Sequence, residues 1–316
     1  MIVFGPVPSR RLGRSLGVNN IPPKVCSYSC VYCQIGRTTR MRIDRKVFYL
    51  PETILKAVKQ KIESAKKARE SIDYITFVPD GEPTLDANLG RTIDALGPLG
   101  IKIAVISNGS LVWQERVRND LEKADWVSLK IDSVREEEWR RINRPYKNFH
   151  LDSILEGLCE FAATYKGDLA TETMLIEGIN DDAYHLKEIA DFLSQLNPSI
   201  AFLAIPTRPP AEKWVQAPNE ALIARAYQIF SKRLENVELL IGYEGNAFAF
   251  TGDVEEDILS ITAVHPMRED AVQSFLKRAK ADWSIIQKLI MQDKLVETNH
   301  KGKKFYMRKL SLRPTE

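Results

Sequence analysis

The chain has 316 residues, of which 44% are apolar and 28% are charged, as in an ordinary globular protein. This length gives room for one large domain, or for a large domain with a small one. No apolar run approaches the roughly 20 residues needed to span a bilayer, and the first residues lack the features of a signal peptide. We therefore expect a cytoplasmic protein with no membrane partner.

The net charge is only +3, but it is spread unevenly along the chain. Residues 1–46 hold nine lysines and arginines against one acid, and residues 263–316 hold twelve against six. Basic ends of this kind are typical of proteins with an anionic partner. A solvated surface would explain them as well, above all at the C-terminal end.

Three of the four cysteines, Cys26, Cys30 and Cys33, lie within eight residues of one another, and Cys159 stands alone. This arrangement is not a disulfide framework. In a reducing compartment, clustered thiols are typical of ligands for a metal ion or an iron–sulfur cluster.

From about residue 50 onward, helical and strand patterns alternate. Apolar residues recur at helical spacing within 52–70, which predicts the first helix. Predicted strands are 74–78, 101–106, 126–131, 170–176 and 200–205, with 237–241 as a candidate sixth. The predicted helices between and after them cover 85–96, 113–123, 136–141, 151–165, 184–196 and 219–234. Helical connections between strands indicate a parallel sheet, and about six repeats predict an α/β fold with a partial (β/α)6 barrel over residues 1–245.

Parallel sheets carry functional residues at the carboxyl ends of their strands. In the predicted strand that ends near Asp132, the side chains of Ser128, Lys130 and Asp132 share one face, and apolar side chains share the other. Buried charge without a partner is unfavourable, so the polar face predicts an interior that holds water or a ligand. An edge strand with a solvated face would show the same pattern.

The alternation ends after the candidate sixth strand, and residues 246–262 are expected to form a linker. Beyond it, residues 263–316 predict a small module. It would contain one helix at 267–278, a second at 282–293, and two strands joined at 299–302, where the sequence has a hairpin signal. Two helices and a basic hairpin are the outline of a winged helix, which often binds nucleic acid. A module that docks on the main domain or on another subunit is the alternative.

The spacing Cys26-x3-Cys30-x2-Cys33 is the strongest chemical signal in the sequence. Thiolates hold iron–sulfur clusters, and three protein ligands would leave one iron of a four-iron cluster open for a substrate or cofactor. Zinc normally takes a fourth ligand nearby, and the candidates His150 and Cys159 lie far along the chain. The spacing alone leaves zinc open as an alternative.

This spacing, with an aromatic residue directly before the last cysteine, resembles the motif of the radical S-adenosylmethionine (SAM) superfamily. The likeness extends over about residues 15–210. That superfamily has a Gly-Gly-Glu-Pro motif after its second strand, and here Asp80 replaces the first glycine. The SAM-binding residues that the resemblance implies are Tyr32, Asp80, Gly81, Glu82, Pro83, Ser107, Asn108, Lys130, Glu172 and Ile205, with Cys26, Cys30 and Cys33 as ligands of a [4Fe–4S] cluster.

The resemblance implies an enzyme with two cofactors, a [4Fe–4S] cluster and SAM. The reduced cluster would cleave SAM to methionine and a 5′-deoxyadenosyl radical, and the radical would take hydrogen from the substrate. An electron donor such as flavodoxin or ferredoxin is implied as a partner. The sequence indicates no catalytic residue beyond the cofactor ligands.

Within the superfamily, the segment from Gly5 to Asn19 resembles a group of uncharacterised iron–sulfur oxidoreductases related to wyosine-type tRNA-modifying enzymes. This likeness favours a tRNA base as substrate, and a small molecule or a peptide is the competing expectation. Arg10, Arg11, Arg14 and Arg208 are candidate contacts to an anionic substrate. The first three could instead pair with the acidic middle of the chain. The alternative from another functional class is an iron–sulfur sensor that binds DNA and has no catalytic activity.

Overall fold

The computed structural model describes residues 2–242, 248, 250, 252–264, 266–300 and 302–309. The main strands are β1 (Val3–Ser9), β2 (Gly13–Val18), β5 (Tyr74–Phe77), β6 (Lys102–Ser107), β7 (Trp126–Lys130), β8 (Asp168–Met174), β9 (Ile200–Ala204) and β10 (Val237–Leu240). The helices among them are α1 (Pro51–Lys67), α2 (Leu89–Leu96), α3 (Glu115–Leu121), α4 (Glu136–Asn143), α5 (Leu151–Thr164), α6 (Ala183–Leu196) and α7 (Glu220–Ser231). Shorter elements are β3 (Val25–Cys26), β4 (Arg40–Met41), η1 (Pro83–Leu85) and η2 (Gly97–Leu99).

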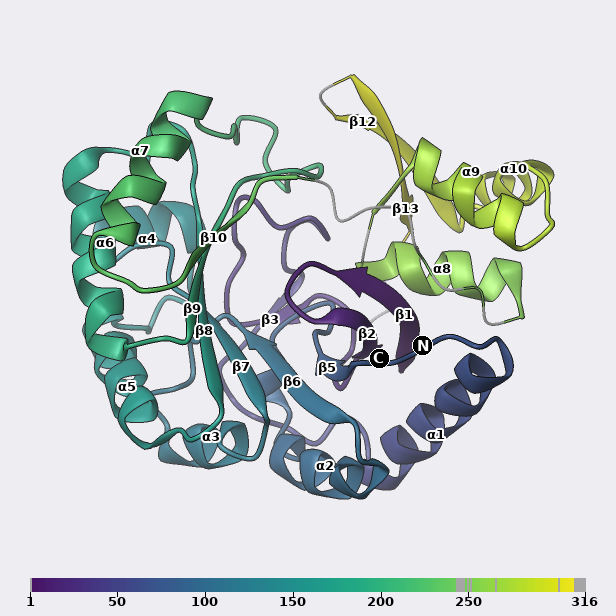
Figure 1. The fold of residues 1–316 in the computed structure, drawn as a ribbon, viewed down its shortest axis with the longest axis horizontal. Helices are drawn as coiled ribbons and strands as arrows, with labels where there is room; N and C mark the ends of the chain where they lie inside the picture. The colour runs from purple at the N-terminus through teal and green to yellow at the C-terminus, as the bar shows by residue number, and fades with distance from the viewer. Residues whose placement is uncertain are drawn as a thin grey trace.

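The eight main strands form one sheet in the order β1-β2-β5-β6-β7-β8-β9-β10. The sheet curls into an open half-barrel, and helices α1 to α7 cover its outer face (Figure 1). Neighbouring strands from β2 to β10 are parallel, and β1 is antiparallel to β2. Six strand–helix units, from β2 with α1 to β9 with α7, confirm the predicted partial (β/α)6 barrel.

Local sequence explains where several of these elements form. The apolar stripe of the first predicted helix is the face that α1 buries, since Ile54 and Val58 have no exposed surface. Helices α6 and α7 follow Asp182 and Asn219, whose side chains accept hydrogen bonds from backbone N–H groups of the first turn. The main apolar core lies between the layer of helices α1 to α7 and the sheet, and it includes Leu129 of β7.

The N-terminal hairpin of β1 and β2 was not among the predicted strands. Pro6 and Pro8 lie within β1 and mask the strand pattern, because proline cannot donate to a sheet ladder. Proline is tolerated on an edge strand, and β1 is one of the two edge strands of this sheet. The turn between β1 and β2 carries Arg10 and Arg11.

The C-terminal part of the described chain runs α8 (Val254–Val264), β11 (Met267–Arg268), α9 (Glu269–Arg278), α10 (Ser284–Met291), β12 (Leu295–His300) and β13 (Lys303–Arg308). Its three strands are antiparallel and follow the order β11-β13-β12. The two predicted helices and the hairpin are therefore present. That the module is a winged helix stays a prediction.

The stretch expected to be a linker holds most of α8. Ile258 and Ile261 of α8 are buried in the apolar core of the C-terminal module, and α8 also lies against β1. Asp257, in the first turn of α8, forms an ion pair of 3.0 Å with Lys61 of α1. The expected boundary between residues 245 and 246 lies outside the described residues. No helix in the described part of the chain is both long and apolar enough to cross a membrane.

Candidate active site

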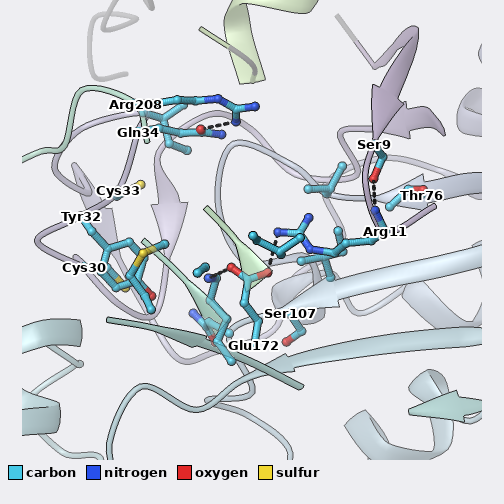
Figure 2. Close-up of a pocket in the computed structure, with 18 of the residues that line it drawn as sticks. Ser9, Arg11, Cys30, Tyr32, Cys33, Gln34, Thr76, Ser107, Glu172 and Arg208 are labelled. Atoms are coloured by element: carbon cyan, nitrogen blue, oxygen red, sulfur yellow. Dashed lines mark hydrogen bonds and ion pairs between the residues drawn. The ribbon is translucent and has the colours of Figure 1, made fainter. Parts of the chain in front are cut away.

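A cavity of about 330 Å³ opens on the inner face of the half-barrel (Figure 2). Its volume lies in the range of small-molecule sites, about 300–1,000 Å³. Its wall combines residues at or near the carboxyl ends of β5, β6, β7, β8 and β9 with residues of the β1–β2 hairpin and the cysteine loop. Because the carboxyl ends of parallel strands meet at one edge of a sheet, residues distant in sequence come together here.

All three clustered cysteines line this cavity. Cys26 ends β3, and the loop that carries Cys30 and Cys33 follows it. The N–H of Val31 donates to the carbonyl of Ile142 at 2.9 Å, which fixes the loop to the end of α4. The predicted cluster ligands are thus held by a folded loop beside the ends of the central strands.

The three thiols favour the neutral form in the chain alone. Burial raises the pKa of Cys30 to about 12, and burial also raises the pKa values of Cys26 and Cys33. A bound metal stabilises the thiolate and releases the proton. The Nδ2 groups of Asn108 and Asn143 lie 3.6 and 3.5 Å from the Sγ atoms of Cys26 and Cys30 and donate to them. Hydrogen bonds of this kind surround the sulfur ligands of iron–sulfur clusters.

The thiols lie along the wall and do not converge on a single point. Among the residues that the structure describes, no group of three or more His, Cys, Asp or Glu side chains forms a site for one metal ion. A four-iron cluster presents a separate iron to each thiolate. The number and type of the donors therefore fit such a cluster.

The loop after β5 packs closely against β3. A Cβ atom at Gly81 would lie 1.9 Å from the backbone oxygen of Val25, so a side chain there would displace the backbone. The carboxylate of Glu82 accepts hydrogen bonds from Ser107 Oγ and from the N–H of Asn108, both at 2.8 Å, and from the N–H of Thr84 at 2.9 Å. Glu82 thereby joins the ends of β5 and β6.

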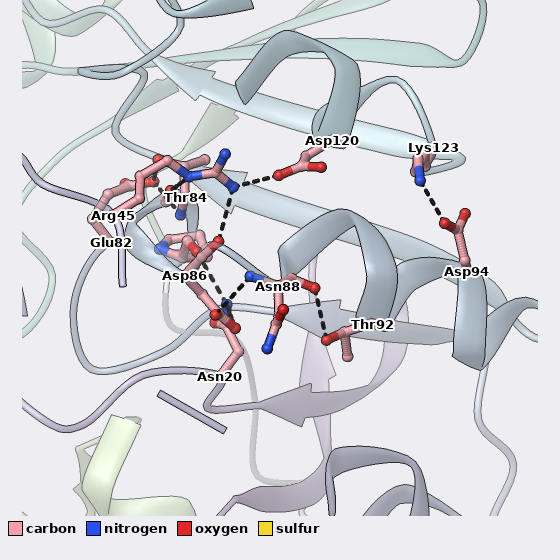
Figure 3. Close-up of polar contacts among 11 residues, drawn as sticks. Asn20, Arg45, Glu82, Thr84, Asp86, Asn88, Thr92, Asp94, Asp120 and Lys123 are labelled. Carbon is pink, nitrogen blue, oxygen red and sulfur yellow. Dashed lines mark hydrogen bonds and ion pairs between the residues drawn. The ribbon is translucent and has the colours of Figure 1, made fainter. Parts of the chain in front are cut away.

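A second set of polar contacts holds the continuation of this loop toward α2 (Figure 3). Asp86 accepts hydrogen bonds from Nδ2 of Asn20 at 3.3 Å and from the N–H of Asn88 at 3.0 Å. Arg45 donates to the backbone oxygens of Thr84 and Asp86 at 2.9 and 2.8 Å. Asp86 is fully buried, and this burial raises its pKa to about 6. The loop is therefore fixed on both sides of Glu82.

Glu172, on β8, lies between two cations inside the cavity (Figure 2). Its Oε2 accepts from Nη2 of Arg11 and its Oε1 accepts from Nζ of Lys130, each at 2.5 Å. Burial by itself would raise the pKa of Glu172, but the two cations outweigh it and hold the pKa at about 2. The carboxylate is therefore ionised at neutral pH, and two cations share it.

Tyr32, directly before the last cysteine, belongs to a buried polar network. Its hydroxyl donates to Oδ2 of Asp132 at 2.5 Å, and Nζ of Lys130 lies 5.2 Å from the centre of its ring. Asn143 donates to the same Asp132 oxygen at 2.7 Å and also contacts Cys30. Asp132 was predicted to lie on the polar face of its strand but was not among the predicted SAM-binding residues. Asn143 was not predicted, and it reaches the site only through the fold.

Most of the predicted site residues meet in this one cavity. Those that line it are Cys26, Cys30, Cys33, Tyr32, Gly81, Glu82, Ser107, Asn108, Lys130, Glu172 and Ile205. Their contact with SAM stays a prediction. Of the candidate substrate contacts, Arg10, Arg11 and Arg208 also line the cavity, and Nη1 of Arg208 donates to Oε1 of Gln34 at 2.5 Å. Arg14 lies outside the cavity wall and pairs with Glu70 instead.

Asp80 and Pro83 are not part of the cavity wall. Asp80 is buried elsewhere, and burial raises its pKa to about 7 although the charge of Lys24 acts against this. The backbone oxygen of Asp80 accepts from the N–H of Lys24 at 2.8 Å. The aspartate that replaces the first glycine therefore places its carboxylate outside the cavity. Pro83 begins η1, and its backbone oxygen accepts from Asn20 at 3.0 Å.

Comparison with known proteins identifies the family. The model of the radical SAM superfamily matches residues 20–193. A UPF0026 protein of Methanocaldococcus jannaschii is 48% identical over 314 residues, which cover 99% of this chain and 97% of that protein. An S-adenosylmethionine-dependent nucleotide dehydratase of Flammeovirga pacifica is 28% identical over 177 residues, which cover 52% of this chain and 59% of that protein.

Among solved structures, TYW1 with a lysine–pyruvate adduct bound aligns over 71% of this chain and 76% of that one, with a TM-score of 0.54 and 18% sequence identity. This likeness concerns the fold alone, and it agrees with the half-barrel described above. The family match covers the cysteine loop and the strands from β5 to β8. The chain therefore belongs to the radical SAM superfamily, whose enzymes use SAM and an iron–sulfur cluster.

Proposed function

We propose that this enzyme cleaves SAM reductively at a [4Fe–4S] cluster and abstracts hydrogen from an anionic substrate. The observation that carries the proposal is the meeting of three thiols and the polar strand ends in one cavity. When bound, the cluster supplies one electron to SAM, which breaks into methionine and a 5′-deoxyadenosyl radical.

The residues of the chain have separate roles in this proposal. Cys26, Cys30 and Cys33 hold the cluster, and one of its irons is left without a protein ligand. Lys130 presents a cation that complements the carboxylate of SAM, and Glu172, which pairs with it, holds that cation in place. The apolar parts of the wall, formed by side chains such as Met174 and Ile205, exclude water from the reacting groups.

The first test is formation of 5′-deoxyadenosine. The protein is reconstituted with iron and sulfide without oxygen, then given SAM and dithionite, beside Cys30→Ala and the matched control Cys159→Ala. Cys159 lies in α5, packed against the main core and outside the cavity. We expect product from the wild type and from Cys159→Ala, and none from Cys30→Ala. Product from Cys30→Ala, or failure of the cluster-loaded wild type to bind SAM, would contradict the proposal.

The charge of the cavity supports an anionic substrate. The described residues of its wall include four cations, Arg10, Arg11, Lys130 and Arg208, and two carboxylates, Glu82 and Glu172. Glu82 is already bound by hydroxyl and N–H donors, and Glu172 is shared by two cations. Guanidinium groups bind phosphate and carboxylate oxygens strongly. The relative from Flammeovirga pacifica is named for action on a nucleotide, which is itself an anion.

The substrate class can be tested without knowing the substrate. Inorganic phosphate and ATP serve as probes, and the melting temperature of the protein is measured with each, because a ligand that binds only the folded state raises it. We expect ATP to stabilise the wild type and Arg91→Gln, an exposed control on α2, and to stabilise Arg208→Gln much less. Equal stabilisation of Arg208→Gln, or none of the wild type by either probe, would contradict an anionic substrate.

A further inference from the structure

A second hollow, of about 400 Å³, lies outside the cavity that holds the cysteines. Its wall is formed by Arg140, Arg141, Arg144 and Trp214, and none of these four residues lines the cavity. Arg140 and Arg141 belong to the last turn of α4, Arg144 ends that helix, and Trp214 lies between β9 and α7. Among the residues that the structure describes, the wall of this arginine hollow thus combines three cations with one aromatic ring and includes no carboxylate.

Two of the three guanidinium groups are held in place by the chain itself. Nε of Arg140 donates to Glu136 at 2.7 Å, and Nη2 lies 2.6 Å from the same oxygen and donates to the backbone oxygen of Phe149 at 2.9 Å. Nη1 of Arg144 donates to Glu212 at 2.5 Å. A side chain that is already fixed loses little freedom when a ligand binds, so these two groups are preorganised.

Many of the donors of these side chains are left for a ligand. A guanidinium group carries five N–H donors. No hydrogen bond or ion pair to another described residue uses Nη1 of Arg140, Nε or Nη2 of Arg144, or any donor of Arg141. The side chain of Arg141 is exposed. The hollow therefore offers donors from all three arginines to an anion.

The backbone of Arg144 points to a requirement for its side chain. Arg144 has a φ of +43°, in the left-handed region where a helix usually ends with glycine or asparagine. The ion pair with Glu212 does not by itself explain an arginine at this strained position, because Glu212 also pairs with Arg37 at 2.8 Å. Strained residues cluster at ligand-binding and active sites, so the conformation supports a ligand at Arg144.

Trp214 presents an apolar ring to solvent. Half of its surface is exposed, although tryptophan is highly buried on average. Stacking of a planar base on an aromatic side chain is favourable for every base, because every base has a π-face. Guanidinium groups bind phosphate oxygens through two parallel N–H donors. A ligand that satisfies both parts of the wall carries phosphate and a planar ring in one molecule.

We propose that the arginine hollow binds a nucleoside diphosphate or triphosphate. Its phosphates accept hydrogen bonds from Arg140, Arg141 and Arg144, and its base stacks on Trp214. The phosphates compensate the charge of the three guanidinium groups, and the volume of the hollow lies within the range of small-molecule sites, about 300–1,000 Å³. The inference does not depend on the cleavage of SAM, since the four residues are separate from the cavity.

The test is a titration of the full chain, loaded with its cluster, with ADP, followed by tryptophan fluorescence. A base that stacks on an indole ring quenches its emission, and Trp214→Phe identifies the signal of Trp214 among the five tryptophans of the chain. Arg141→Gln removes a guanidinium that no other described residue holds, so this variant should fold normally. Arg91→Gln on α2 is the matched control, and Arg208→Gln reports any contribution from the cavity. Inorganic pyrophosphate, which has no ring, is used to displace ADP.

We expect ADP to quench the wild type to saturation and to leave the emission of Trp214→Phe unchanged. Arg141→Gln should bind ADP about tenfold more weakly, as expected for the loss of one charged hydrogen bond, while Arg91→Gln and Arg208→Gln should match the wild type. Pyrophosphate should bind at least about tenfold more weakly than ADP, because it gains no stacking.

The proposal would be overturned if the wild type showed no saturable quenching, or if quenching persisted in Trp214→Phe. Equal affinity of Arg141→Gln and the wild type for ADP, or loss of the quenching in Arg208→Gln, would overturn it as well. Pyrophosphate that binds as tightly as ADP would have the same consequence, since the hollow would then be a simple anion site.

Discussion

Replacing Glu172 with glutamine removes the one buried carboxylate that the half-buried cations Arg11 and Lys130 share. Its side chain is 3% exposed, and those of Arg11 and Lys130 are 18% and 20% exposed. The shift of its pKa from the ordinary value of 4.5 to about 2 corresponds to roughly 3 kcal/mol in favour of the folded, ionised state. Removing one member of a buried ion pair typically destabilises a protein by about 3–5 kcal/mol. We therefore expect Glu172→Gln to lower the free energy of unfolding by about 3 kcal/mol near neutral pH.

The effect should depend on pH in a defined direction. Because folding depresses the pKa of Glu172, the stability it contributes is present above its unfolded-state pKa of about 4.3. That contribution is lost as the pH falls through the folded-state pKa of about 2. The difference between wild type and Glu172→Gln should thus shrink to roughly half its neutral value near pH 3.

Urea unfolding of the metal-free protein, followed by tryptophan fluorescence, measures both the difference and its pH dependence. The matched control is Glu63→Gln, which makes the same change in a carboxylate that is 64% exposed and paired with Lys66, itself 69% exposed. An exposed pair of this kind contributes less than about 1 kcal/mol. The reasoning would be refuted if Glu172→Gln were as stable as Glu63→Gln at neutral pH, or if the difference grew on acidification.

Three further predictions concern the loops of the site. Burial raises the pKa of Asp86, so the stability that its protonated form contributes is lost as the pH rises through about 6. Between about pH 4 and about pH 8, the free energy of unfolding of the wild type, measured in urea, should therefore fall by about 2 kcal/mol relative to that of Asp86→Asn. Gly81→Ala should lower the free energy of unfolding by about 3 kcal/mol, because its Cβ would meet a backbone oxygen. Asn143→Ala should make the potential of the reconstituted cluster more negative in a titration followed by electron paramagnetic resonance, because the hydrogen bond to Cys30 favours the reduced state.

Each of these predictions has a control or an opposing outcome. The reasoning on Asp86 fails if the difference between the two proteins is constant across that pH range. Gly97→Ala is the control for Gly81→Ala, since a Cβ at Gly97 meets nothing within 4 Å, and it should change stability by less than about 1 kcal/mol. An unchanged or more positive cluster potential in Asn143→Ala would show that its amide does not act on the sulfur.

The barrel and the cysteine motif could be predicted because their signals are local. Apolar periodicity predicted the helices that cover the sheet. Ser107, Lys130 and the other polar residues lie at or directly after the ends of predicted parallel strands, and this position alone predicts that they meet at one edge of the sheet. The motif of Cys26, Cys30 and Cys33 depends on local spacing, and its resemblance to a superfamily adds the neighbouring Tyr32 and the short motif from Asp80 to Pro83. These features need no knowledge of contacts between distant segments.

What the sequence could not indicate depends on such contacts. The partner of Arg11 is Glu172, which lies 161 residues away, and only the curl of the sheet brings them together. The glycines at positions 242, 245 and 252 and the acids from Asp253 to Asp257 suggested a linker, yet negative charge at the start of α8 stabilises a helix. Asp80 was expected among the SAM-binding residues by its place in the motif, and its carboxylate lies outside the cavity because the packing of the loop against β3 cannot be read from the motif.

The contact between β1 and α8 has a consequence for synthesis of the protein on the ribosome. The strand β1 is made first, but the helix that lies against it is made only after the whole half-barrel. Until α8 emerges, Val7 of β1 lacks the apolar neighbours that it has in the folded protein, and β1 remains an uncovered sheet edge, which is prone to pair with other chains. Nascent chains that stop before α8 should therefore associate with chaperones or aggregate, whereas chains that extend past it should not.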